Sequence, residues 1–389
     1  MLTRRLAHGN VGAIALTMAV TIVILGTIGL ARLGSADASA PAARRPAAPL
    51  PAAVAQPIGA LGAASADAAL GLPTPYYEPP RVADPTTPGT TIVSGADQPD
   101  PFILVQGGRD YLFTSQDRVP ANVPVRAGTT VGSWGPMTDA LPDLPPWAET
   151  GATWAPDVHR FGDHYILYFT AAVAGISSPG MQCIGDAIST RPDGPYLSNP
   201  DQFICQRDQG GSIDPRTFVD PDGTPYLLWK SDNNAAPRYG DTSIYSQQLS
   251  PDGEHLLGRA TRIFGPDEPW QGAIVEAPDL VAVRGSYYLF YSGNWFNQPD
   301  YAIGVAPCAG PLGPCIDTSA SPLLGSNAQG IGPGEESVFT DARGVWLLYT
   351  PFRSTLPLPG PPRPVAMAHL GFGVGLPYLA ATQAVGGSP

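Results

Sequence analysis

Three acidic residues in this chain lie close to a proline at the start of similar short segments. Asp100 and Asp214 directly precede a proline, and Glu276 is followed by Ala-Pro. Carboxylates crowded into one place repel each other, so one keeps its proton near neutral pH while another stays ionised. Such a pair separates a general acid from a general base, which is what the hydrolysis of a glycosidic bond requires. We therefore take Asp100, Asp214 and Glu276 as candidate catalytic residues.

A repeated pattern must bring these residues together. Each copy has a short apolar segment, a tight turn and a second segment rich in aromatic residues, as in residues 274–292, which is typical of a β-hairpin. Five copies occur, at steps of 55, 59, 63 and 59 residues between Pro101, Pro156, Pro215, Pro278 and Ser337. This period predicts an all-β, five-bladed β-propeller. Because the first strand of each blade lines the central channel, the three acids should converge at one end of it.

The composition supports β structure and limits the partners. The 389 residues include 45 glycines and 46 prolines, which suits turn-rich sheets better than helices. The net charge is −12 at pH 7. A nucleic-acid partner normally needs a basic surface that neutralises phosphates, so the acidic balance argues against one.

The N-terminal region divides into two further segments. Residues 1–40 contain Arg4, Arg5 and an uncharged apolar run over residues 11–30, which indicates a cleaved signal peptide or an uncleaved membrane anchor in equal measure. Residues 41–80 are rich in alanine and proline and predict a disordered linker. Residues 81–389 then form the propeller. Both interpretations place it outside the cytoplasm, secreted or held at the membrane by its N-terminal segment.

Four cysteines lie in the predicted propeller. An even number in an exported chain favours disulfides, and the short Gly-Pro-rich loop between Cys308 and Cys315 favours pairing those two. Cys183 and Cys205 would then form the second pair. A zinc site is less favoured, because neither pair has a Cys-x-x-Cys spacing. Four unrelated buried thiols are the remaining alternative.

Taken together, the motifs resemble glycoside hydrolase family 43. The resemblance covers roughly residues 95 to 375 and rests on four ordered motifs, which are Asp100-Pro101-Phe102, Trp154-Ala155-Pro156-Asp157, Ser212-Ile213-Asp214-Pro215 and Val275-Glu276-Ala277-Pro278. It implies that Asp100 is the general base, Glu276 the general acid, and Asp214 the carboxylate that orients the acid and adjusts its pKa. It also implies inversion of configuration, with acid and base roughly 6.5–9.5 Å apart. The substrates implied are furanoside or xyloside linkages in arabinan-type polysaccharides or oligosaccharides, and no cofactor is required.

One position departs from the family pattern. The family commonly has a histidine before the fifth inner strand, near a calcium or sodium ion on the axis, where this chain has Glu335 and Glu336. Glu335 could hold a structural calcium ion, which carboxylates bind well, or could raise the pKa of Asp100. An alternative function is therefore a catalytically impaired carbohydrate-binding propeller. A fructosidase-like propeller hydrolase is a third, although this chain lacks the Asn-Asp-Pro-Asn signature expected there.

Four further residues are candidates for holding a sugar. Phe102, Trp154 and Trp295 could stack against a sugar ring, although most aromatic residues in propellers pack between blades. Arg353 could donate hydrogen bonds to sugar hydroxyls, and its alternative role is a surface salt bridge.

Overall fold

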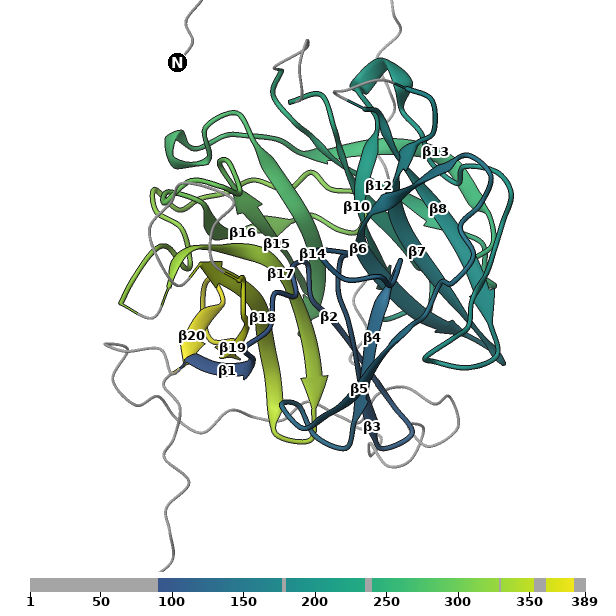
Figure 1. The fold of residues 1–389 in the computed structure, drawn as a ribbon. Helices are drawn as coiled ribbons and strands as arrows, with labels where there is room; N and C mark the ends of the chain where they lie inside the picture. The colour runs from purple at the N-terminus through teal and green to yellow at the C-terminus, as the bar shows by residue number, and fades with distance from the viewer. Residues whose placement is uncertain (1–89, 177–179, 235–239, 329, 353–361, 381–389) are drawn as a thin grey trace, which may run out of the picture. The chain divides into compact units, whose positions relative to one another are not determined.

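The computed structural model describes residues 90–176, 180–234, 240–328, 330–352 and 362–380, and within these ranges it is built from strands and two short 3-10 helices. Five antiparallel sheets form the five blades of a β-propeller (Figure 1). The predicted fold class is confirmed. Residues 1–40 and 41–80, predicted to be an export segment and a linker, lie outside the described residues. In the described ranges, no helix is long and apolar enough to cross a membrane.

The first two blades contain four strands each. The first blade consists of β2 (Phe102–Gln106), β3 (Arg109–Phe113), β4 (Pro124–Gly128) and β5 (Trp134–Asp139). The second consists of β6 (Ala148–Phe161), β7 (His164–Val173), β8 (Gln182–Ser189) and β9 (Leu197–Ser198).

A short helix precedes each of the next two blades. Helix η1 (Arg207–Gln209) leads into the third blade, which consists of β10 (Ser212–Val219), β11 (Pro225–Ser231), β12 (Ile244–Leu249) and β13 (Leu256–Phe264). Helix η2 (Pro269–Gln271) leads into the fourth, which consists of β14 (Val275–Val283), β15 (Ser286–Gly293) and β16 (Ala302–Cys308).

The fifth blade joins the two ends of the described chain. It contains β17 (Ile331–Asp341), β18 (Gly344–Phe352), β19 (Val365–Gly371), β20 (Tyr378–Ala380) and β1 (Thr90–Ser94). Strand β1 pairs antiparallel with β19, with Thr91 opposite Met367. The ring is therefore closed by backbone hydrogen bonds between the beginning and the end of the propeller (Figure 1).

Apolar clusters fill the spaces between neighbouring blades. Along β7, Leu167 and Phe169 pack toward the first blade, whereas Ile166 and Tyr168 pack toward the third. This is the period-two alternation of a strand buried on both faces, so the segment reads as a continuous apolar run. In the part of the chain that the structure describes, five such clusters occur, one for each pair of adjacent blades.

The inner strands share a backbone feature that sets the position of the acidic residues. A residue with positive φ lies just before β2 and within each of the other four inner strands, namely Asp100 (52°), Ala155 (46°), Asp214 (56°), Ala277 (50°) and Glu335 (53°). Non-glycine residues pay roughly 1–3 kcal/mol for such a conformation, and it is common at functional sites. Pro101, Pro156, Pro215 and Pro278 each directly follow one of these residues, so their equivalent in the fifth blade is Glu336 rather than Ser337. Glu276 lies one residue before Ala277, which holds the position of Asp100 and Asp214.

Two disulfides join neighbouring segments of the propeller. Cys183 in β8 is bonded to Cys205, which precedes η1, and Cys308 at the end of β16 is bonded to Cys315. The predicted pairing is confirmed. Both bonds tie irregular segments to regular strands.

Candidate active site

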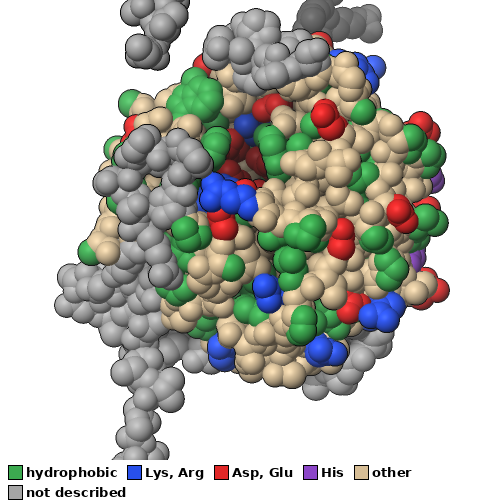
Figure 2. Space-filling view, viewed as in Figure 1, with side chains coloured by type: hydrophobic (Ala, Val, Ile, Leu, Met, Phe, Trp, Pro, Cys, Tyr) green, Lys and Arg blue, Asp and Glu red, His purple; other side chains and the backbone are tan. Residues whose placement is uncertain are grey.

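A cavity of about 700 Å³ opens at the end of the ring where the inner strands begin. Figure 2 shows a hollow with acidic side chains on its floor and a basic side chain at its edge. Of the residues predicted from the sequence, the cavity is lined by Asp100, Asp214, Glu276, Trp154, Trp295 and Glu335. The three candidate catalytic carboxylates therefore face one space, as their common position in the repeat predicted.

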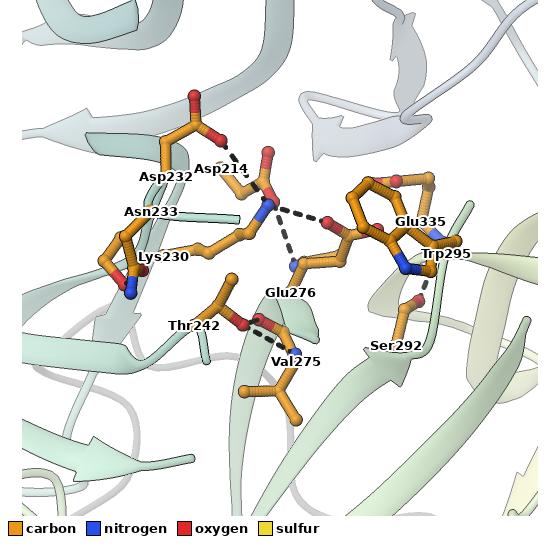
Figure 3. Close-up of polar contacts among 12 residues, drawn as sticks. Asp214, Lys230, Asp232, Asn233, Thr242, Val275, Glu276, Ser292, Trp295 and Glu335 are labelled. Carbon is orange, nitrogen blue, oxygen red and sulfur yellow. Dashed lines mark hydrogen bonds and ion pairs between the residues drawn. The ribbon is translucent and has the colours of Figure 1, made fainter. Parts of the chain in front are cut away.

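Glu276 is held on both of its oxygens by buried partners, of which Figure 3 shows Lys230. Lys230 Nζ, at the end of β11, lies 2.8 Å from Glu276 Oε2, and Tyr301 OH lies 2.8 Å from Oε1. Both partner side chains are only 2% exposed. Lys230 also lies 3.7 Å from Asp232 Oδ1, and this charge environment raises the pKa of the lysine above its ordinary value against the effect of burial.

Asp214 contacts the chain next to Glu276 rather than its carboxyl group. The backbone N–H of Ala277 donates to Asp214 Oδ2 at 3.1 Å, and the backbone N–H of Asp214 donates to Thr170 Oγ1 at 3.1 Å. Burial raises the pKa of Asp214 to about 7, while Lys230 acts in the opposite direction. Asp214 thus fixes the backbone that carries Glu276.

Asp100 is anchored by Ser115, which follows β3 of the first blade and is itself bonded to the second blade. Ser115 Oγ donates to Asp100 Oδ2 and accepts a hydrogen bond from the Ala155 N–H at 2.7 Å. Burial raises the pKa of Asp100, and the nearby Arg363 guanidinium opposes that shift. The carboxyl group is therefore oriented into the cavity by an uncharged donor.

Glu335 lies between the candidate base and the candidate acid. Its side chain lines the same cavities as Asp100, and its Oε1 lies 2.8 Å from Tyr301 OH. The Glu335 N–H donates to Ser292 Oγ at 3.0 Å, which fixes the start of the bulge (Figure 3). Burial, then the negative charges of Asp100 and Glu276, raise the pKa of Glu335 well above its usual range.

A second buried layer lies along the inner strands, centred on Arg216. Its guanidinium lies 3.3 Å from Asp157, 3.7 Å from Asp279 and 4.9 Å from the centre of the Phe102 ring. Phe102 was predicted to stack against a sugar, but its ring packs on Arg216 and is not part of the cavity lining. The ring is therefore placed against Arg216 rather than toward the cavity.

The comparisons with known proteins agree with this geometry. The model of glycosyl hydrolases family 43 matches residues 90–371. The chain belongs to this family. A crystal structure of a thermostable family-43 glycoside hydrolase is similar with a TM-score of 0.66 and 27% identity, covering 76% of this chain and 96% of that one.

Two curated relatives indicate which family 43 activities are close in sequence. A β-D-galactofuranosidase of Aspergillus niger is 27% identical over 218 residues, 52% of this chain and 58% of its own length. An extracellular exo-α-(1→5)-L-arabinofuranosidase of Streptomyces chartreusis is 24% identical over 310 residues, 74% of this chain and 88% of its own length. The chain thus spans a little over half the length of the first relative.

The residues described on the propeller axis differ from those expected around the predicted calcium or sodium ion. Within the described ranges, no group of three or more His, Cys, Asp or Glu side chains could hold a metal ion. A cavity of about 10 Å³ on the axis is lined by Arg216 as well as Asp214 and Glu335, so a guanidinium already supplies positive charge there. Glu335, predicted as a cation ligand, instead directs its Oε1 to Tyr301 and lines the cavity with Asp100.

The remaining predicted residues have mixed outcomes. Trp154 and Trp295 line the cavity, and Trp295 is 41% exposed at its edge. Arg353 lies outside the described residues. Sequence reasoning missed Lys230, Tyr301 and Arg363, because none of them belongs to a motif at the start of a blade. One signal was present, since Lys230 is the single lysine of the chain.

Proposed function

We propose that this family 43 protein is an inverting glycoside hydrolase that cleaves furanoside or xyloside linkages of arabinan-type polysaccharides outside the cytoplasm. The observation that carries the proposal is that Asp100 and Glu276, from the first and fourth blades, face the same cavity of about 700 Å³. A cavity of this size suits a sugar ligand of a few rings. The likeness to an arabinofuranosidase and a galactofuranosidase supports a furanoside.

The chemistry assigns one task to each carboxyl group. Asp100 removes a proton from a water molecule as that water attacks the anomeric carbon, and Glu276 protonates the leaving oxygen. Asp214 holds the backbone at Ala277 and so orients Glu276. Trp154 and Trp295 stack on the sugar rings at the cavity wall.

The proposal is tested by hydrolysis assays on the purified full chain. Aryl α-L-arabinofuranoside, β-D-galactofuranoside and β-D-xyloside are compared with arabinan, and the anomer released first is identified by NMR. We expect hydrolysis of at least one furanoside or xyloside with inversion. Retention of configuration would contradict the assigned roles of Asp100 and Glu276.

A second candidate function is a carbohydrate-binding propeller without turnover. It is favoured by Glu335, which puts an additional carboxyl group against Asp100 where the family pattern has a histidine. Calorimetric binding of arabinan oligosaccharides without any product would support this alternative and contradict the hydrolase.

Two observations support export. The disulfides suit an oxidising compartment, and the Streptomyces chartreusis relative is described as extracellular. Mass spectrometry of the mature protein distinguishes a cleaved signal from an anchor, because removal of residues 1–40 leaves Pro41 at the N-terminus.

A further inference from the structure

An inverting glycosidase ends each reaction with its two carboxyl groups in the wrong protonation states. The attacking water gives a proton to the base as its oxygen bonds to the anomeric carbon. The acid gives its proton to the leaving oxygen as the glycosidic bond breaks. Before the next turnover, Asp100 must lose a proton and Glu276 must gain one. This requirement rests on the proposed function.

Two residues, Glu335 and Tyr301, lie between Asp100 and Glu276. Tyr301 OH lies 2.8 Å from Glu276 Oε1 and 2.8 Å from Glu335 Oε1. Glu335 and Asp100 line the same two cavities, and each carboxyl group influences the pKa of the other. Two hydrogen bonds therefore connect Glu335 through Tyr301 to Glu276, and Asp100 lies beside the Glu335 end.

The number of protons in this chain of contacts is constrained. A phenol has a single hydrogen, so Tyr301 cannot donate to Glu276 and Glu335 together. One of the two carboxyl groups must be protonated and donate to the phenol oxygen. Transfer between Asp100 and Glu335 likewise needs a proton on one of them. A neutral Glu335 beside an ionised Asp100 meets this second condition, in agreement with the raised pKa of Glu335.

The surroundings keep this path in place. The Tyr301 ring lies against Gly334, where an added Cβ would come within 2.0 Å of a ring carbon. Titratable groups facing the path are Asp214 on β10, Lys230 at the end of β11, Asp232 just after it and Arg363 beside Asp100. Lys230 and Arg363 stabilise the ionised states of Glu276 and Asp100, so either end can hold the charge.

We propose that Glu335 and Tyr301 form an internal path that returns a proton from Asp100 to Glu276 after each turnover. Protonated Asp100 gives its proton to one oxygen of Glu335, Glu335 gives the proton on its other oxygen to Tyr301, and Tyr301 gives its phenolic hydrogen to ionised Glu276. One O–H bond breaks at Asp100 and one forms at Glu276. Glu335 and Tyr301 keep the same number of protons, with the Glu335 proton now on the oxygen that faces Asp100, and rotation of that carboxyl group prepares the next transfer without another reactant.

The internal path has a kinetic advantage while product fills the cavity. Glu276 is 6% exposed and Tyr301 is 2% exposed, so each presents little surface to solvent even in the empty site. A bound sugar excludes water further. Return of the proton through buried groups lets the site reset before the product leaves.

The test is pre-steady-state kinetics of Tyr301→Phe on an oligosaccharide that the wild-type enzyme hydrolyses. The variant keeps the ring against Gly334 and removes only the hydroxyl. We expect later turnovers to be slower than the first by about tenfold or more, which appears as a burst, whatever the effect of losing the Tyr301 contact on the first turnover. Small buffer acids such as formate or imidazole should restore the later turnovers in proportion to their concentration, because they deliver the missing proton.

Two further variants make the test specific. Glu335→Gln interrupts the same path, and the double variant should be no slower than either single one, because a path broken once is already broken. Tyr291→Phe is the matched control, since its buried hydroxyl bonds Asp317 and Gln271 away from the cavity, and it should show no burst.

Three results would overturn the inference in different ways. If the wild type is active and Tyr301→Phe slows the first turnover as much as later ones, without rescue by buffer, Tyr301 only positions Glu276. An unchanged steady-state rate in a folded Tyr301→Phe protein would also reject the path. A wild type inactive on every glycoside would reject the proposed function itself, and the path with it.

Discussion

Replacing Lys230 by methionine should cost stability in a way that depends on pH. Lys230 Nζ lies 2.8 Å from Glu276 Oε2, and Asp232 lies 3.7 Å away. At an effective dielectric constant of about 20, the attraction across 2.8 Å is about 6 kcal/mol before the cost of desolvation. Methionine fills a similar volume, so the main loss is this charge.

The loss is limited because a buried carboxyl group can take up a proton instead. A glutamate in the unfolded chain has a pKa of about 4.3, so keeping it protonated costs about 4 kcal/mol at pH 7 and about 1 kcal/mol at pH 5. The sign follows from proton counts, because the folded variant binds more protons than the unfolded variant above pH ~4.3, so its stability falls as pH rises. In the wild type, the raised pKa of Lys230 supplies stability that is fully present below pH ~10 and does not change over this range.

Urea unfolding at pH 5, 6 and 7 measures the effect, with both disulfides intact. We expect Lys230→Met to lose about 1 kcal/mol at pH 5 and up to about 4 kcal/mol at pH 7. Adding Glu276→Gln in the same chain removes the unpaired carboxyl group and should recover most of the loss at pH 7. An equal loss at both pH values, or no recovery in the double variant, would refute the ion pair as the cause.

Three other predictions concern the site and the disulfides. Glu276→Gln should almost abolish cleavage between sugars but keep measurable activity on an activated aryl glycoside. Asp100→Asn should lose activity on both substrates, because no water is activated. Equal losses for Glu276→Gln on both substrates, at unchanged melting temperature, would reject Glu276 as the acid. Selective 15N-lysine labelling should give a single Nζ signal that stays in its ammonium form through pH 10, because the pKa of Lys230 is raised; titration of that signal below pH 10 would contradict the buried contacts. Replacing Cys183 and Cys205 together by alanine should lower the free energy of unfolding by about 3 kcal/mol, because the bond closes a loop with a sequence separation of 22. An unchanged free energy of unfolding would show that the bond does not constrain the unfolded chain.

The blade repeat could be predicted because it is written in the sequence as periodic strand pairs and turns. The position of the acids within the repeat could not be predicted to the residue. A bulge with one extra residue interrupts each of the last four inner strands. Because these strands are apolar on both faces, the shift in alternation that the bulge causes is not visible in the sequence. The fifth blade has no proline at this point, so Ser337 was taken as equivalent to Pro101, whereas the positive φ of Glu335 makes Glu336 the equivalent residue.

The partners of the acids were missed for a related reason. Lys230 ends the second strand of the third blade and Tyr301 precedes the third strand of the fourth, so neither lies at the start of a blade where the motifs are. Phe102 shows the opposite case. An aromatic residue next to Asp100 suggested a sugar platform, but only the fold reveals that Arg216 covers its ring.

The charges around the cavity indicate which sugars this site can accept. In the described lining, seven carboxyl groups face three cations, the carboxyl groups being Asp97, Asp100, Asp117, Asp214, Asp232, Glu276 and Glu335, and the cations Arg118, Lys230 and Arg363. Full ionisation would leave an excess of negative charge, so some of these carboxyl groups stay protonated near neutral pH. A negative surround stabilises the positive charge that develops on the sugar ring in the transition state. The same surround repels uronic acids, so a neutral furanoside or xyloside fits these charges and an acidic polysaccharide does not.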